Sequence, residues 1–219
     1  MSQLFRFTKW ILLIALLSIS ISSCRPPEEI PTIPPTPTPE AALEIDLMVT
    51  PSPTAFRVHP PDTRVGIDQI DRVLEAVLEG GTEELIQVVA FTTTACTNAD
   101  GLGGPPKCRA GEIEGAQVEV LPFSGPEGHY LRASEIAEWS GLDIAGLYAI
   151  YRNSEQVYSK VYFPAGDFSI LLIGNQEWRD YNLRIDEHGI VRVDNIIGSS
   201  PQVDLEREAA EVILPPPVQ

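Results

Sequence analysis

A proline-rich stretch divides this chain and limits where it can fold. Eleven of the twenty prolines fall within residues 25–61, concentrated in 31–39 and again at Pro51 and Pro53. Proline has no backbone N–H and forces the preceding residue into an extended conformation, which excludes helices and central strands and favours polyproline II. We interpret residues 24–61 as a stalk, about 30 Å long as a coil and about 100 Å when fully extended. A single domain is expected at residues 64–214.

The residues before the stalk have the pattern of an export signal. Arg6 and Lys9 precede a run, residues 10–21, that is apolar apart from two serines. A membrane-spanning helix needs about 20 apolar residues, so this run is short for a transmembrane segment and typical of a secretory signal. The segment Ile21-Ser22-Ser23-Cys24 resembles the lipobox of bacterial lipoproteins, whose cysteine is acylated and becomes the N-terminus after cleavage. The alternatives are an ordinary signal peptide and an uncleaved anchor.

This resemblance implies a location and a mode of attachment. Residues 1–23 would be the cleaved signal peptide, and Cys24 would carry the acyl chains, such as palmitate, that hold the protein in the bilayer. Each buried CH₂ group contributes about 0.8 kcal/mol, so two or three chains anchor a protein firmly. We therefore expect a lipid-anchored protein on the extracytoplasmic side of a bacterial cell envelope. Whether that envelope has one membrane or two is not encoded here.

The charge of the chain excludes one class of partner. It has 31 acidic and 15 basic side chains and a formal net charge of −16. Nucleic acid binding requires clustered Lys and Arg that neutralise phosphates, so nucleic acid is not an expected partner. A strongly negative surface also keeps a domain soluble and disfavours self-association, so we expect a monomer.

The body of the chain begins with helical periodicity and continues with strand-like segments. Apolar residues recur at helical spacing over 67–78, with Gly80 and Gly81 as the stop, and a second helix is expected to start at Thr82 as its cap. A short helix is expected at 134–139. Segments rich in β-branched and aromatic residues predict strands at 118–123, 147–151, 157–163, 168–173, 181–185 and 190–197.

These elements predict an α+β domain with two N-terminal helices against a curved antiparallel sheet of about five or six strands. Their order over residues 66–198, ending in the hairpin 183–193, resembles the cone-shaped nuclear-transport-factor-like fold. That fold is shared by steroid isomerases, dehydratases and many non-catalytic modules, and the resemblance includes no diagnostic motif. A cystatin-like sheet around a helix and an unfamiliar α+β lipoprotein domain are the alternatives.

The segment between Cys96 and Cys108 is the most individual part of the chain. With Cys24 acylated, the three cysteines resolve into one anchor and one pair, and an exported domain meets oxidising conditions. We therefore predict a disulfide between Cys96 and Cys108, with a stabilisation of about 3 kcal/mol in the chain-entropy account. A metal or redox pair is disfavoured because the spacing is not CxxC and no histidine lies nearby.

Two partial motifs inside this loop do not support a cofactor. Asn98, Asp100 and Gly101 resemble part of a calcium loop, but Lys107 occupies the position of the required bidentate glutamate. A turn with Gly101 at positive φ is the better interpretation. The run Gly101-Leu-Gly-Gly104 lacks the flanking strand and helix of a dinucleotide site and the Lys-Ser/Thr of a P-loop. We expect a stapled surface loop that takes part in recognition, with no metal and no cofactor.

No arrangement of residues indicates catalysis. His59, His129 and His188 are far apart in the sequence and lack partners at ligand spacing. Six aromatic residues are candidates for a pocket lining but are better explained as core, namely Trp139, Tyr148, Tyr151, Tyr158, Tyr162 and Trp178. The leading hypothesis is a non-catalytic binding or structural module that contacts an envelope protein or a small ligand. The alternative is a small cone-fold hydrolase or isomerase with an Asp or His base in its pocket.

Overall fold

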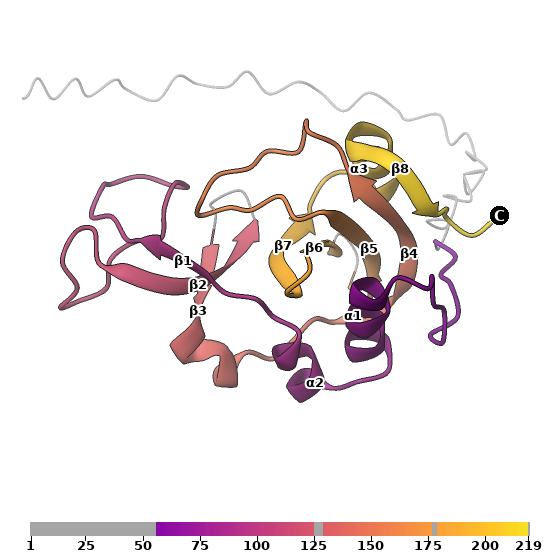
Figure 1. The fold of residues 1–219 in the computed structure, drawn as a ribbon, viewed down its shortest axis with the longest axis horizontal. Helices are drawn as coiled ribbons and strands as arrows, with labels where there is room; N and C mark the ends of the chain where they lie inside the picture. The colour runs from indigo at the N-terminus through magenta and orange to yellow at the C-terminus, as the bar shows by residue number, and fades with distance from the viewer. Residues whose placement is uncertain (1–55, 125–128, 177–178, 219) are drawn as a thin grey trace, which may run out of the picture. The chain divides into compact units, whose positions relative to one another are not determined.

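The structure, a computed structural model, describes residues 56–124, 129–176 and 179–218 (Figure 1). The predicted signal peptide, Cys24, most of the predicted stalk and Trp178 lie outside the described residues. The helices are α1 (Asp68–Leu78), α2 (Thr82–Gln87), the 3₁₀ helix η1 (Ala133–Glu138) and α3 (Pro201–Glu208). The strands are β1 (Thr92–Ala95), β2 (Gln117–Ser124), β3 (His129–Arg132), β4 (Ile144–Asn153), β5 (Phe168–Gly174), β6 (Asp180–Ile185), β7 (Ile190–Ile196) and β8 (Ala209–Leu214).

All eight strands belong to one mixed sheet, so the α+β class is confirmed. The strand order is β1-β2-β7-β6-β5-β4-β8, and β3 pairs with β2 beside this path. The prediction of a purely antiparallel sheet of five or six strands is wrong, because β2 and β7 are parallel where Phe123 pairs with Val193. The added strands β1 and β3 have only four residues each, so the sequence carries little signal for them. The third added strand, β8, is an apolar segment of six residues that the sequence analysis did not assign.

The segment 157–163 was predicted to be a strand but does not form one. The segment forms turns, and within the described residues its ladder contact is a single bridge between Lys160 and Phe163. Both edges of the preceding strand β4 are already occupied, by β5 and β8. The aromatic residues of 157–163 pack locally instead, with the Arg192 guanidinium 4.0 Å from the Phe163 ring centroid.

Helix α1 supplies the core on one face of the sheet. Ile70, Val73 and Leu74 are fully buried and belong to the same apolar cluster as the inward residues of β4 to β7. The Asp71 carboxylate accepts hydrogen bonds from the backbone N–H groups of Val65 and Gly66, at 2.8 and 2.9 Å, which secures the start of the helix. This is the amphipathic pattern that the sequence shows over 67–78.

Helix α2 follows after the two glycines. Its N-cap is Gly81, one residue before the predicted cap Thr82, and Thr82 is its first helical residue. The Glu84 carboxylate accepts a hydrogen bond of 2.8 Å from the Gly81 N–H, and this bond lowers the pKa of Glu84. The negative charge of Glu84 also interacts favourably with the positive N-terminal end of the helix dipole.

The second face of the sheet is covered as well. Helix α3 places Leu205 in a smaller apolar cluster with Tyr148, Tyr151 and Leu171. Strands β4 to β7 are therefore buried on both faces, as their almost continuous buried residues show. The consequence for function is that polar side chains on this second face are enclosed.

Residues that the sequence assigns to the stalk lie along the sheet. The N–H of His59 donates to Leu147 O of β4 at 2.8 Å, and the ring Nε2 of His59 donates to Pro215 O at 2.9 Å. A Cβ at Gly146 would lie 2.7 Å from Val58, so glycine lets this segment approach β4 closely. The chain thus enters the domain beside β4, next to the C-terminal residues.

Candidate functional site

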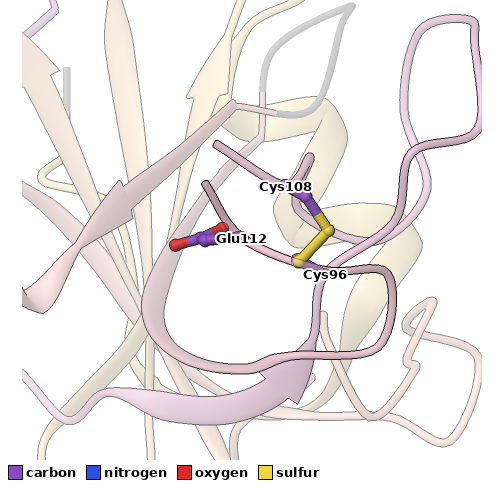
Figure 2. A group of neighbouring side chains, drawn as sticks. All are labelled: Cys96, Cys108 and Glu112. Carbon is purple, nitrogen blue, oxygen red and sulfur yellow. A yellow bond between two sulfur atoms is a disulfide. The ribbon is translucent and has the colours of Figure 1, made fainter. Parts of the chain in front are cut away.

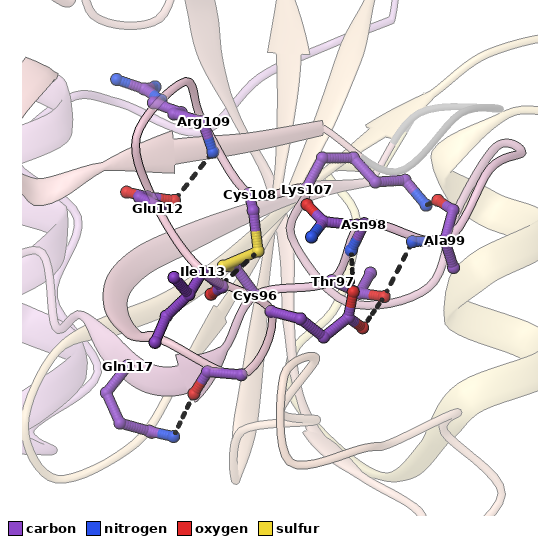
Figure 3. Close-up of a disulfide and its surroundings, with 12 residues drawn as sticks. Cys96, Thr97, Asn98, Ala99, Lys107, Cys108, Arg109, Glu112, Ile113 and Gln117 are labelled. Carbon is purple, nitrogen blue, oxygen red and sulfur yellow. Dashed lines mark hydrogen bonds between the residues drawn. A yellow bond between two sulfur atoms is a disulfide. The ribbon is translucent and has the colours of Figure 1, made fainter.

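A disulfide joins Cys96 to Cys108 at the β1 end of the sheet, which is the predicted pair (Figure 3). Cys96 directly follows β1, and its N–H donates to Ala116 O just before β2. Thr97 forms two backbone hydrogen bonds across the base of the loop, from its N–H to Pro106 O at 2.9 Å and from the Cys108 N–H to its own carbonyl at 3.0 Å. We call residues 96–108 the stapled loop, because a covalent bond and a short ladder both close its base.

Two carboxylates brace the stapled loop from the following turn, residues 109–116. Glu114 accepts hydrogen bonds from Thr97 Oγ1 at 2.9 Å and from the Asn98 N–H at 2.8 Å. Glu112 accepts one from the Arg109 N–H at 2.8 Å, which is the main reason why the pKa of Glu112 is lowered. The two carboxylates therefore hold the backbone of the stapled loop and of the turn that follows it.

The partial calcium motif has the positive φ that was predicted at Gly101. Gly101 has φ of 104°, a left-handed conformation that glycine adopts without strain. The Asn98 backbone is held by Glu114, and the Lys107 ammonium donates to Ala99 O at 2.8 Å, so a cation already occupies this side of the loop. These contacts favour the turn interpretation over a calcium loop.

One cluster in the described residues has the composition of a metal site. Ligand atoms of Cys96, Cys108 and Glu112 lie within 4.8 Å of one another (Figure 2). The two sulfurs are bonded to each other, however, and Glu112 accepts hydrogen bonds from Arg109 and Arg132. A disulfide offers no thiolate to a metal, so the cluster is explained by the staple and its brace.

A pocket of about 360 Å³ lies between the stapled loop and β3. Its lining includes the basic residues Lys107, Arg109, His129 and Arg132, together with Tyr130 and the glycines of the loop. Arg132 is largely buried and donates to Lys107 O at 2.9 Å and to Glu112 at 3.0 Å, which ties β3 to the loop. Arg109 forms an ion pair with Glu135 of η1.

The structure does not bring the three histidines together. His59 lies beside β4, His188 is in the turn between β6 and β7 with Glu187 at 3.5 Å, and His129 begins β3. His129 lines the pocket, but it is exposed, and three of the other residues that line the pocket are basic. That environment differs from the apolar cavity in which a histidine base is expected.

The predicted aromatic residues are also distributed over the domain. Tyr148 and Tyr151 are buried under α3, and Trp139 packs edge-on against Phe123 at 5.6 Å between ring centroids. Tyr158 is instead exposed. A second pocket of about 450 Å³ is lined by residues of β2, β6 and β7 and includes Tyr181, Asn195 and Arg179.

The sequence analysis missed a buried row of polar side chains on the face covered by α3. The strand register pairs Tyr151 with Ser169, Ser169 with Arg184, and Arg184 with Arg192 across β4 to β7. The Arg184 side chain is 2% exposed and donates to Ser169 Oγ and to Asp194, both at 2.8 Å. The row therefore crosses four strands inside the protein.

Acidic residues balance the charge of this row. Asp194 accepts hydrogen bonds from both Arg184 and Arg192, and Glu208 of α3 accepts from Arg184 and from Tyr151. Burial alone would raise the pKa of Glu208, but the guanidinium groups of Arg184 and Arg207 together outweigh it, and the pKa is lowered. Neither pocket described above is lined by these side chains, and their ion pairs satisfy one another, so the row serves to attach α3 to the sheet.

One sequence signal for α3 is visible in retrospect. Ser200 is its N-cap and Pro201 its first residue, a combination favoured at the start of helices. Had α3 been predicted, a helix covering the second face of the hairpin 183–193 would have been expected.

No described helix is long and apolar enough to cross a membrane. The chain matches no protein-family model, and neither a curated protein nor a solved structure is detectably similar to it.

Proposed function

We propose that this protein is an extracytoplasmic lipoprotein, anchored in the bilayer through acylated Cys24, whose domain is a non-catalytic binding or structural module. The expected partner is an envelope protein or a small ligand, and nucleic acid is not expected. The cysteine pairing supports the anchor, because Cys96 and Cys108 are bonded to each other and Cys24 remains for acylation.

The stapled loop is the observation that carries the binding role. Leu102 at its tip and Ile113 in the bracing turn are each 77% exposed, although both are large apolar residues. The disulfide and the carboxylates of Glu112 and Glu114 hold the backbone around them, which reduces the entropy lost on binding. An apolar pair on a rigid frame is the composition expected of a recognition surface.

The position of this loop in the sheet suits a tethered protein. The loop follows β1, at one end of the strand order, whereas His59 bonds to β4 near the other end. The side on which the chain enters the domain and the stapled loop are therefore separated by the width of the sheet.

The cone-shaped nuclear-transport-factor-like fold and the cystatin-like fold stay proposals for the finer architecture. Helix α1 packs against the sheet with Ile70, Val73 and Leu74 fully buried, and none of these residues lines either pocket. We favour the binding module over the alternative, a small hydrolase or isomerase with a pocket Asp or His base, because the described lining of the two pockets includes no Asp and no buried His.

Site-specific photo-crosslinking in the native envelope tests the proposal. A photoreactive phenylalanine analogue replaces Leu102 or Ile113 in the full acylated chain, and the matched control carries it at Val161, which is 80% exposed on the 157–163 loop. We expect a discrete adduct from positions 102 and 113 and none from 161. Equal adducts from all three positions, or none from any, would contradict a recognition role for the loop.

A substrate screen tests the enzyme alternative in parallel. The same chain is incubated with ester, phosphoester, peptide and glycoside reporters, with and without substitution of His129. Turnover that disappears on that substitution would replace the binding module with the enzyme.

A further inference from the structure

The pocket beside the stapled loop has a charge opposite to that of the chain. Four of its described lining residues are basic or histidine, namely Lys107, Arg109, His129 and Arg132, and none of the described lining residues is acidic. The chain as a whole has 31 acidic and 15 basic side chains. A positive recess in a strongly acidic protein concentrates anions locally, because a concave site focuses the field of its own charges.

The ion pairs around the pocket leave one positive charge uncompensated. Arg132 is paired with Glu112, and Arg109 is paired with Glu135. The Lys107 ammonium donates to the neutral carbonyl of Ala99, and the described part of the chain places no carboxylate within ion-pair distance of it. Two carboxylates thus face three cations, and Lys107 is the charge available to an incoming anion.

Glycine backbone forms part of the same wall. Gly101, Gly103 and Gly104 have φ of 104°, 73° and 75°, and a Cβ added at any of them would meet no atom within 4 Å. Their N–H groups find no acceptor within the described residues. Backbone N–H groups in such turns form concave binding sites for anions, and here they lie beside a lysine.

Tyr130 provides an aromatic side to the pocket. Its hydroxyl donates to Gly104 O at 2.7 Å. Burial, with smaller contributions from Tyr162 and Tyr158, raises the pKa of Tyr130 to about 12, so the ring stays neutral. The pocket volume of about 360 Å³ exceeds what a bare oxyanion requires and lies in the range of small-molecule sites, about 300–1,000 Å³.

We propose that this pocket binds a monosaccharide unit that carries a phosphate or carboxylate group, with Lys107 and the glycine backbone at the oxyanion and Tyr130 against the sugar ring. This inference rests on the proposed binding function and names its ligand class. A charge-assisted hydrogen bond from Lys107 supplies affinity, and the apolar face of a sugar ring packs on an aromatic side chain. The net charge of −16 repels long polyanions, which favours a single charged unit.

Calorimetric titration of the full acylated chain in detergent micelles tests the proposal. The probes are glucose 6-phosphate, glucuronate, uncharged glucose and inorganic phosphate. We expect at least one charged sugar to bind at least about tenfold more tightly than glucose and than phosphate, and added salt to weaken it. The better of the two charged sugars identifies the oxyanion.

Two lysine variants separate the pocket from general electrostatics. Lys107→Gln should weaken binding of the charged sugar about tenfold, the equivalent of about 1.4 kcal/mol. Lys107→Arg, which keeps the charge, should retain most of the affinity. Lys160→Gln is the matched control, because Lys160 lies over the Tyr158 ring at 5.7 Å and does not line the pocket.

The outcomes are distinct. No binding of either charged sugar, equal losses from Lys107→Gln and Lys160→Gln, or glucose or phosphate binding as tightly as the charged sugar would overturn the assignment. If Leu102 and Ile113 still give specific crosslinks when the probes fail, the ligand class is wrong and the binding module stands. If the crosslinks fail as well, both proposals are wrong.

Discussion

Replacing Arg184 by methionine should remove much of the stability of the domain. Methionine keeps an apolar stem of similar length and deletes the guanidinium, which makes five hydrogen bonds in the structure. Its acceptors lie on four different elements, namely Tyr151 and Asn153 of β4, Ser169 of β5, Asp194 of β7 and Glu208 of α3. The substitution leaves two carboxylates in the interior with one cation fewer.

The magnitude follows from the burial of this group. The Arg184 side chain is 2% exposed, and those of Asp194 and Glu208 are 11% and 12% exposed. Breaking a buried ion pair by removing one partner costs about 3–5 kcal/mol, because the other charge stays desolvated. For a domain of this size each kcal/mol corresponds to about 2–4 °C, so the melting temperature should fall by roughly 6–20 °C.

The assay is urea and thermal unfolding of the Cys24→Ser chain, followed by circular dichroism. Arg152→Gln is the matched control, because Arg152 pairs with Glu211 between β4 and β8 while both side chains are well exposed, at 49% and 64%. An exposed pair contributes about 0–1 kcal/mol, so this variant should unfold close to the wild type. The two substitutions thus remove the same charge at different burial, one from β6 and the other from β4.

The reasoning would be refuted if Arg184→Met and Arg152→Gln had equal effects. A second variant separates the unpaired charge from the lost packing. Adding Glu208→Leu to Arg184→Met removes a carboxylate that the first change leaves buried, so the double variant should be less unstable than the sum of the single changes. Additive losses would show that the two residues do not act as a pair.

Three further outcomes are expected. Glu208→Gln should destabilise the domain most near neutral pH. The difference in unfolding free energy from the wild type should shrink as the pH falls below 4.5, the ordinary pKa of this carboxyl. The reason is that the pKa of Glu208 is lower in the folded state, so its stabilisation is lost only as the carboxylate becomes protonated. Urea unfolding from about pH 3 to pH 7 measures this, and a constant difference would contradict it. Changing Cys96 and Cys108 together to alanine should cost about 3 kcal/mol by loss of loop closure, whereas thiol labelling of the folded wild type should reach neither residue. Cys24→Ser should release the protein from the membrane fraction. The intact mass of the wild type should lack residues 1–23 and include a diacylglyceryl group. Unchanged membrane retention with an unmodified cysteine would contradict anchoring through Cys24.

The stapled loop shows which parts of the candidate site can be predicted from local sequence. Three cysteines, one of them in a lipobox, leave one possible intramolecular pair, so the bond between Cys96 and Cys108 is predictable from the sequence. The positive φ at Gly101 is also predictable, because it follows from the residues of the segment 98–101 alone. The pocket is not, since Arg132 reaches Lys107 O and Glu112 only because β3 pairs with β2.

The sequence alone determines those features whose cause lies within a few residues. The proline-rich stretch cannot form regular hydrogen-bonded structure, the period of Ile70, Val73 and Leu74 yields a helix with one apolar face, and alternation yields strands. Alternation assigns residues to two faces of a sheet but does not say whether each face meets water or protein. That was decided by tertiary structure, because Arg184 and Arg192 have the spacing of solvent-facing residues and yet are buried. Arg184 is covered by α3, from the far end of the chain, whose Glu208 accepts a hydrogen bond from its guanidinium. Arg192 is covered by the 157–164 segment, where its guanidinium lies 4.0 Å from the Phe163 ring centroid and donates to Tyr158 O. Burial is a property of what covers a residue, and both covers lie outside the strands that carry these arginines.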